Sequence, residues 1–385
     1  MGYITCFARR SLRGCSKRVV STITKSPLTN ERITYYSELD ALRAVAVTLT
    51  LLAHYLGRVG FKEIPYLWLG VDVFFVLSGF LITGILLKIK PVEIERIRGI
   101  KIFFIRRVLR LFPAYYLLIT VYWIALKLGN LYIWNENYDV YFFTYIPNWF
   151  FFLYPEQNSG SFNHMWSLGV EEQFYLIWPW IILYLPKKFL RNLLLVLIGV
   201  SIVLRVVFLN VPNFTMLPIS NLHTLGSGAL LSYFYFEKPE SAFFKRVSAH
   251  RQILFLIALS ILVSILVFLP RSIEKSILSD LLVSFSASIL VLCCVKGWSG
   301  PLKMFSSNNI IQYIGKISYG IYLYHMPIPD TIIAIGKFAG LDIKFQYHPY
   351  LWLGVFFILV FCIAHFSFIL IEKRFLKMKP AFVKK

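Results

Sequence analysis

Long apolar runs alternate with short polar segments along almost the whole chain, from Ala41 to Ile371. Runs of about 17 or more mostly apolar residues are long enough to cross a lipid bilayer as helices. We therefore predict an all-α, polytopic membrane protein with about ten transmembrane helices. The predicted spans lie at 41–59, 67–87, 111–128, 174–186, 192–209, 219–236, 253–269, 278–295, 319–338 and 351–371.

The fourth predicted span, 174–186, has the weakest pattern. The segment that leads into it, 141–154, is rich in Phe, Tyr and Trp. Such an aromatic stretch fits an eleventh membrane segment, a re-entrant segment or one that lies at the membrane interface.

Composition supports the membrane class. Hydrophobic residues make up 58% of the chain and charged residues 15%, whereas soluble domains carry about 25% charged residues. The net charge of +21 does not predict a nucleic-acid partner, because no contiguous basic face on a soluble fold is visible. The five cysteines lack the spacing of a metal site, so we predict no metal and take the lipid bilayer as the surrounding partner.

The distribution of positive charge predicts the orientation. If both termini are cytoplasmic, 32 of the 40 Lys and Arg residues fall in cytoplasmic segments, as the positive-inside rule requires. We predict a basic cytoplasmic tail at 1–35, a membrane domain at 36–376 and a second basic tail at 377–385, in the cell inner (plasma) membrane. The first tail also has the composition of a transit peptide.

Two polar residues lie on one face of the first predicted span. Arg43 and His54 are eleven residues apart, which places them within about 20° of each other around a helix and about 16 Å apart along it. A charged residue in mid-bilayer costs about 2.5–3.5 kcal/mol. The pair therefore predicts a cavity lined by His54, although a lone intramembrane histidine is often a packed, hydrogen-bonded residue.

The second predicted span carries Asp72 near its outer end and Ser78 in its middle. A carboxylate at the depth of His54 would orient the imidazole. The alternative is that Asp72 lies at the membrane interface and pairs locally. Gly79, next to Ser78, predicts close helix packing.

Charged and aromatic residues gather at three further places. Arg107 and Arg110 lie three apart on one helical face, a spacing that suits phosphate recognition. His164, Trp166, Glu171 and Glu172 form an acid and aromatic group that suits a sugar. Tyr319, Tyr322 and His325 recur every third residue before Pro327 and Pro329 interrupt the helix, which fits either a pore lining or ordinary interfacial tyrosines.

These segments together resemble the acyltransferase-3 family of integral membrane acyltransferases. The resemblance rests on the spacing of Arg43 and His54 and on five segments, GVDVFFVLSGFLIT at 70–83, RRVLRLFP at 106–113, HMWSLGVEEQFYLIWP at 164–179, ISYGIYLYHMPI at 317–328 and FSFILIEKRFL at 366–376. One difference is Gly169, where many members have Ser.

The resemblance implies transfer of an acyl group, usually acetyl, from cytoplasmic acyl-CoA to a hydroxyl of an extracytoplasmic carbohydrate such as O-antigen or exopolysaccharide. It implies catalysis by His54, with Glu171 or Glu172 in the acidic motif of the family, and donor binding by Arg43, Arg107 and Arg110. Asp72 is a further catalytic candidate from its predicted depth beside His54. Acetyl-CoA is then a substrate, and no bound cofactor is expected. We expect the acceptor to meet Ser78, His164, Trp166, Tyr319, Tyr322 and His325. No SGNH hydrolase-like domain follows, so we expect transfer to finish here or on a partner.

A transporter or flippase for a lipid-linked saccharide is the main rival, because polar residues inside many helices also line translocation paths. The cytoplasmic arginine pair and the helix that carries Arg43 and His54 favour the enzyme.

Overall fold

A computed structural model describes residues 36–60, 69–90, 96–129, 138–157, 160–268 and 273–378. These residues are almost entirely helical and contain no strand, which confirms the predicted all-α class. Both predicted basic tails lie largely outside the described residues.

Each predicted span falls on a helix. The long helices are α3 (Ser37–Arg58), α4 (Leu69–Ile89), α5 (Arg96–Gly129), α8 (Met165–Tyr184), α9 (Lys187–Val207), α10 (Leu222–Glu237), α11 (Ala242–Phe268), α12 (Ile273–Val295) and α17 (Pro349–Ser367). Shorter helices connect them, namely α6 (Asp139–Phe143), α7 (Pro147–Leu153), α13 (Gly300–Ser307), α14 (Asn309–Lys316), α15 (Ser318–Tyr324), α16 (Pro327–Phe338) and α18 (Lys373–Lys377). Turns of 3-10 helix lie at η3 (Gly160–Phe162), η4 (Phe214–Met216), η5 (Pro218–Asn221) and η6 (Phe345–Tyr347), and η7 (Phe368–Glu372) is a π-helical turn.

Among the described residues, six helices are long and apolar enough to cross a membrane. They cover Ser37–Arg58, Leu69–Ile89, Arg96–Ala125, Lys187–Val207, Leu278–Val295 and Pro349–Lys377. The protein is thus a multi-pass membrane protein. The number of ten crossings, the cytoplasmic termini and the inner membrane stay predictions.

Two helices begin before the spans predicted on them. Helix α8 starts at Met165, nine residues before the fourth predicted span, and therefore includes Glu171 and Glu172. Helix α5 starts at Arg96, before the third predicted span, and runs unbroken through Arg107 and Arg110. Apolar length alone missed both starts, since polar residues that face a protein interior do not end a helix.

Two irregular segments follow the sequence signals. The helix of the ninth predicted span is interrupted at His325 and Met326, directly before Pro327 at the start of α16. The aromatic stretch 141–154 forms most of α6 and all of α7, with Tyr145 between them at a positive φ of 63°. Seven residues of α7 extend only about 10 Å, too short to cross a bilayer.

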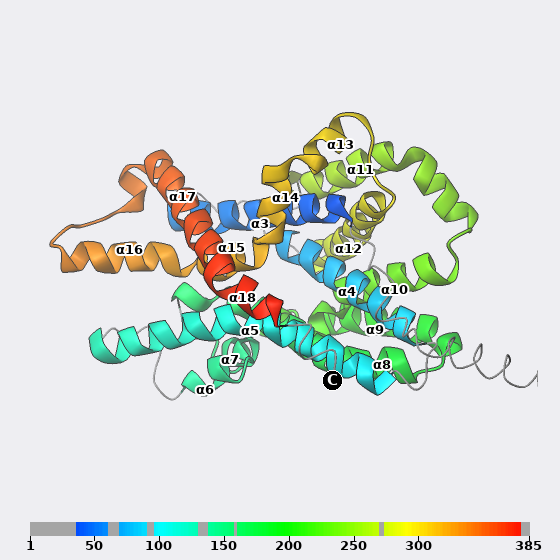
Figure 1. Ribbon diagram of the computed structural model, residues 1–385, viewed down its shortest axis with the longest axis horizontal. Helices are drawn as coiled ribbons and strands as arrows, with labels where there is room; N and C mark the ends of the chain where they lie inside the picture. Colours follow the sequence, from blue (N-terminus) through cyan, green and yellow to red (C-terminus); the bar gives the residue numbers. More distant parts are fainter. Residues whose placement is uncertain are drawn as a thin grey trace, which may run out of the picture.

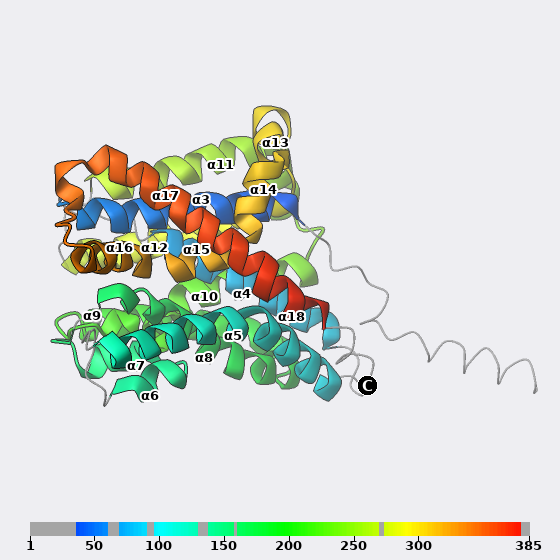
Figure 2. The same cartoon turned by 60° about the vertical axis from the view of Figure 1, so that its left-hand side comes forward.

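Helix α4 lies near the centre of the bundle, where it packs against α3, α8, α10 and α12. In the view of Figure 2, α3, α11, α13, α14 and α17 lie above the level of α4 and α10, while α5 to α9 lie below it. Figure 1 shows α3 and α16 extending to the same side of the molecule. A helix surrounded on several sides is apolar all round, and α4 shows this composition apart from Asp72, Ser78, Thr83 and, in its last turn, Lys88.

The crossing of α4 and α10 depends on two glycines. A Cβ atom added to Gly79 would lie 2.0 Å from the carbonyl oxygen of Leu225, and one added to Gly228 would lie 2.0 Å from that of Val76. Both obstacles are backbone atoms, which cannot move away as a side chain would. The sequence-based prediction that Gly79 permits close packing is confirmed.

We expect Gly79→Val to prevent normal assembly of the bundle. Overpacking a filled interior usually costs about 1–3 kcal/mol, and a clash with backbone falls at the upper end of that range or beyond it. Gly199→Val is the matched control, because nothing lies within 4 Å of a Cβ atom at that position on α9. Thermal unfolding of the detergent-solubilised variants measures the difference, and equal stability of the two would contradict the proposed role of the crossing.

Candidate active site

Three histidines from separate segments form a cluster inside the bundle. His54 comes from α3, His164 immediately precedes α8, and His325 joins α15 to α16. The ring centroid of His325 lies 4.7 Å from that of His54 and 4.8 Å from that of His164. His164 and His325 are buried and His54 is partly exposed. The fold thus brings together three residues that the sequence placed in separate groups.

The hydrogen bonds of the cluster assign a tautomer to the rings of His325 and His54. His325 Nδ1 lies 2.6 Å from the carbonyl oxygen of Tyr322, so Nδ1 donates and Nε2 is an acceptor. His54 Nδ1 lies 2.9 Å from the carbonyl oxygen of Thr50 and 3.1 Å from His325 Nε2. His54 Nδ1 therefore carries the proton and donates to both acceptors. In neutral His54 the lone pair is consequently on Nε2, the nitrogen that can act as a base.

A cavity of about 210 Å³ lies beside the cluster, between α3, α4, α5, α8 and α15. Seven of the residues predicted for the site line it together with apolar side chains of α4 and α5. They are Arg43, Ser78, Arg107, Arg110, Glu171, Tyr319 and Tyr322. The sequence-based assignment of these residues to a common site agrees with their placement, whereas their chemical roles stay predictions.

A chain of hydrogen bonds crosses one wall of the cavity. Tyr175 Oη donates to Ser78 Oγ at 2.8 Å, and Ser78 Oγ donates to Glu171 Oε1 at 2.7 Å. The guanidinium of Arg107 lies over the Tyr175 ring, with Cζ 4.4 Å from its centroid. This stacking holds Arg107 in place and leaves the edge of its guanidinium available for an anion.

Positive charge is concentrated at the same cavity. Arg110 has both Arg43 and Arg107 as close electrostatic neighbours. Arg43 forms an ion pair with Asp40, with Nη1 and Oδ1 2.5 Å apart, and Arg107 and Arg110 are electrostatic neighbours of Glu171. Three guanidinium groups around one cavity favour an anion with several oxygens.

Ser167 and Tyr322 separate this cavity from the histidines. Both line the cavity, and their hydroxyl oxygens are 2.6 Å apart. Tyr322 Oη also donates to the carbonyl oxygen of His164 at 3.0 Å. The two hydroxyls thus lie between the cavity and His164.

Two predicted site residues lie beside the cavity and do not line it. Trp166 packs edge-on against Phe75, with ring centroids 6.0 Å apart. Glu172 points toward a group of tyrosines that includes Tyr116 and Tyr145, and its buried Oε1 has no hydrogen-bond partner among the described residues. The expectation that adjacent acids face different sides of a helix holds, since only Glu171 enters the cavity.

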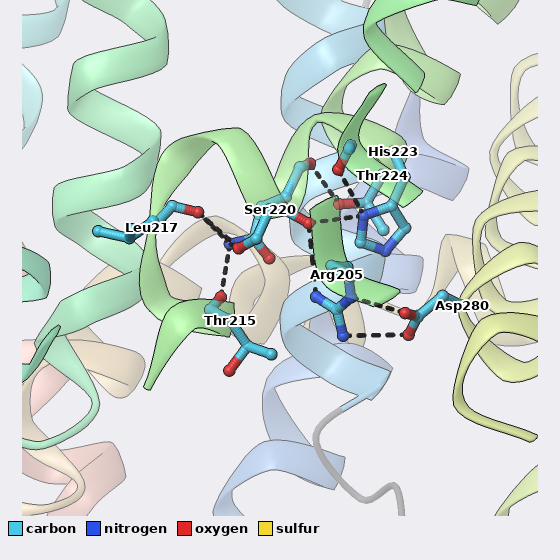
Figure 3. A network of polar contacts seen from close by, with 9 residues as sticks. Arg205, Thr215, Leu217, Ser220, His223, Thr224 and Asp280 are labelled. Atoms are coloured by element: carbon cyan, nitrogen blue, oxygen red, sulfur yellow. Dashed lines mark hydrogen bonds and ion pairs between the residues drawn. The ribbon is translucent and has the colours of Figure 1, made fainter. Parts of the chain in front are cut away.

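Asp72 belongs to a different network. Its electrostatic neighbours are Arg205 and Asp280, which form a bidentate ion pair with Nε–Oδ2 and Nη2–Oδ1 distances of 2.6 and 3.1 Å. Figure 3 shows this pair next to His223, whose Nδ1 donates to the carbonyl oxygen of Ser220. The network joins α4, α9, α10 and α12, and these neighbours of Asp72 belong to it and not to the histidine cluster.

The prediction missed several residues that the fold brings to the site. Ser167 follows His164 by three residues, and Tyr175 follows Glu171 by four, so helical spacing from a chosen residue was an available signal in both cases. Glu372 is buried in η7 and is an electrostatic neighbour of Arg110. Glu372 lies in the segment FSFILIEKRFL that carries part of the family resemblance, but helical spacing could not connect it with Arg110, because α17 and η7 bring it to α5 from the far end of the chain.

Comparison with known proteins identifies the family of the chain. The family model described as "Acyltransferase domain" matches residues 36–367. The chain belongs to this acyltransferase family. The match contains the histidine cluster and all of the residues that line the cavity, and it confirms the predicted family and the predicted class of membrane acyltransferase.

The relatives compared are 30% identical to the chain over the matched residues. Peptidoglycan O-acetyltransferase OatA of Listeria monocytogenes is 30% identical over 361 residues, which cover 88% of this chain and 55% of OatA. Putative peptidoglycan O-acetyltransferase YrhL of Bacillus subtilis is 30% identical over 375 residues, 88% of this chain and 54% of YrhL. O-acetyltransferase OatA of Staphylococcus aureus is 30% identical over 321 residues, 76% of this chain and 50% of that protein. The chain spans about half the length of these relatives, and no solved structure matches it.

Proposed function

We propose that the protein is a membrane O-acetyltransferase that moves an acetyl group from acetyl-CoA to a hydroxyl of an extracytoplasmic glycan. The observation that carries the proposal is the adjacency of two sites, an arginine-lined cavity and a histidine cluster, separated by Ser167 and Tyr322. The first suits an anionic donor and the second suits removal of a proton from an acceptor.

The donor binds at the arginines in this proposal. Arg107 and Arg110 hold phosphate oxygens of acetyl-CoA, and the cavity receives the thioester end. A volume of about 210 Å³ accommodates the acetyl group and part of the pantetheine arm, while the nucleotide stays outside on the cytoplasmic side predicted from the charge distribution.

The acyl transfer step follows from the tautomer of His54. Nε2 accepts the proton of the glycan hydroxyl while the hydroxyl oxygen attacks the thioester carbonyl. The C–S bond then breaks, the acetyl group stays on the glycan as an ester, and the CoA sulfur leaves as a thiolate that takes the proton from His54. The positive charge on the imidazolium is transient, and His325 Nε2 and the Thr50 carbonyl oxygen stabilise it by accepting from Nδ1.

Peptidoglycan is the first acceptor to test. Two relatives are described as peptidoglycan O-acetyltransferases, whereas the resemblance of the sequence favoured O-antigen, a part of lipopolysaccharide, or exopolysaccharide. All three are extracytoplasmic glycans that present free hydroxyl groups, so the same chemistry serves each.

Membranes that contain the protein, acetyl-CoA labelled in the acetyl group and de-O-acetylated glycan test the proposal directly. We expect label to become bound to the glycan and to be released by mild alkali, which cleaves esters. Parallel reactions with peptidoglycan, O-antigen and exopolysaccharide identify the acceptor. Movement of a lipid-linked saccharide across the membrane without label on any glycan would instead support the transporter reading.

A further inference from the structure

A second polar layer lies next to the histidine cluster and is built from the same three segments. Arg58 follows His54 by four residues on α3, Asp330 follows His325 by five, and Ser161 precedes His164 by three. Four helical residues correspond to a rise of about 6 Å. Each histidine thus has one member of this layer within about two helical turns along its own segment.

Direct contacts connect the three side chains of this outer polar layer. Arg58 Nη1 lies 2.5 Å from Asp330 Oδ1, and Ser161 Oγ donates to Asp330 Oδ2 at 2.5 Å. Arg58 is also an electrostatic neighbour of both His54 and His325. The carboxylate of Asp330 therefore receives one donor on each oxygen, while the guanidinium of Arg58 faces the histidines.

The layer lies on the opposite side of the histidines from the arginine-lined cavity. Arg43 precedes His54 on α3 and Arg58 follows it, so the two arginines extend toward opposite ends of that helix. The Arg58 end of α3 and the whole of α16 lie at the same end of the molecule in Figures 1 and 2. With the predicted orientation, that end faces the outside of the cell, from which a glycan arrives.

Neither member of the ion pair is fully buried. The side chains of Arg58 and Asp330 are 23% and 30% exposed. Solvent weakens an ion pair at this level of exposure, so either partner can exchange part of the pair for another ligand. A sugar hydroxyl both donates and accepts hydrogen bonds, and neighbouring hydroxyls on one ring match a guanidinium beside a carboxylate.

We propose that Arg58 and Asp330, with Ser161 fixing the carboxylate, bind the acceptor sugar and present its hydroxyl to His54. Asp330 accepts a hydrogen bond from one hydroxyl, and Arg58 donates to a neighbouring oxygen of the same sugar. This inference rests on the proposed function, because it assigns the acceptor subsite of that reaction.

Binding of a defined glycan fragment tests the subsite without any need for turnover. The probe is a tetrasaccharide of alternating N-acetylglucosamine and N-acetylmuramic acid without O-acetyl groups, titrated against the purified full chain in detergent. We expect the wild type to bind it and Asp330→Asn and Arg58→Lys each to raise Kd about tenfold, the loss expected for one charge-assisted hydrogen bond. Asp342→Asn is the matched control, since Asp342 forms an exposed ion pair with Lys344 and should leave Kd unchanged.

The double variant with exchanged residues, Arg58→Asp with Asp330→Arg, distinguishes sugar binding by the pair from a purely structural ion pair between α3 and α16. It restores an ion pair between α3 and α16, so thermal stability should return to that of the wild type. The Kd should stay at least about tenfold raised, because the donor and the acceptor now occupy each other's places. Recovery of wild-type Kd in the exchanged pair, unchanged Kd in both single variants, or no binding of the tetrasaccharide by the wild type would each overturn the proposal. Label transfer in the acetyl-CoA assay tests the proposed reaction separately.

Discussion

His54→Ala should abolish acetyl transfer while the protein still accumulates in the membrane at the normal level. The ring of His54 supplies the Nε2 lone pair that accepts the proton of the acceptor hydroxyl, and alanine offers no base. Loss of a positioned general base lowers rates by about 10²–10⁴-fold. The initial rate of label transfer at saturating acetyl-CoA and glycan, normalised to folded protein, measures this effect.

His54→Gln distinguishes proton transfer from hydrogen bonding. The amide of glutamine can donate to the Thr50 carbonyl oxygen as His54 Nδ1 does, but it cannot take a proton at neutral pH. The Gln variant should therefore be as inactive as the Ala variant, although its local hydrogen bond is retained. His365→Gln is the matched control, because His365 lies on α17 beside Tyr313 and outside the cluster.

Near-normal turnover by His54→Gln would exclude general-base catalysis by His54. The search for the base would then move to Glu171, Glu172 and His325. His325 has an unprotonated Nε2 in the same cluster. Glu171 lines the cavity together with Ser167.

The fold could be predicted well where it depends on apolar length. The second predicted span, 67–87, and the eighth, 278–295, agree closely with α4 and with a candidate span ending at Val295. Prediction failed at the start of α8, where Ser167, Glu171 and Glu172 interrupt the apolar run. These side chains are polar because they face a cavity or other side chains, and a scale based on lipid exposure cannot distinguish that environment from water.

The site could be predicted in part because helical spacing brings certain residues onto one face. Arg43 and the Arg107–Arg110 pair needed only that geometry, and all three line the cavity. The spacing of residues along one helix cannot predict contacts between segments that are distant in the sequence. The packing of α15 against α3 and α17 places His325 beside His54, and the position of Asp72 beside Arg205 and Asp280 depends on how α4 meets α9 and α12.

Loss of either cavity arginine of α5 should weaken the use of acetyl-CoA as the acyl donor. Arg107→Ala and Arg110→Ala should each raise the KM for acetyl-CoA about tenfold or more, with a smaller change in kcat, because hydrogen bonds to charged groups contribute about 1.5–3 kcal/mol. Lysine should rescue Arg107 only partly. It keeps the positive charge but loses both the planar fork and much of the stacking on the Tyr175 ring.

Arg106→Ala provides the control for these donor variants. Arg106 lies on the same turn of α5 and carries the same charge, yet it does not line the cavity. The three arginines could instead act only through their positive charge, by setting the membrane orientation of α5. All three Ala variants should then change this orientation to a similar extent and have similar KM values. If Arg107 and Arg110 bind the donor, Arg106→Ala should keep the wild-type KM. An unchanged KM for acetyl-CoA in the double Ala variant of Arg107 and Arg110, at normal protein level, would contradict donor binding by the pair. The two arginines would then act in membrane orientation, and the cavity would no longer be assigned to acetyl-CoA.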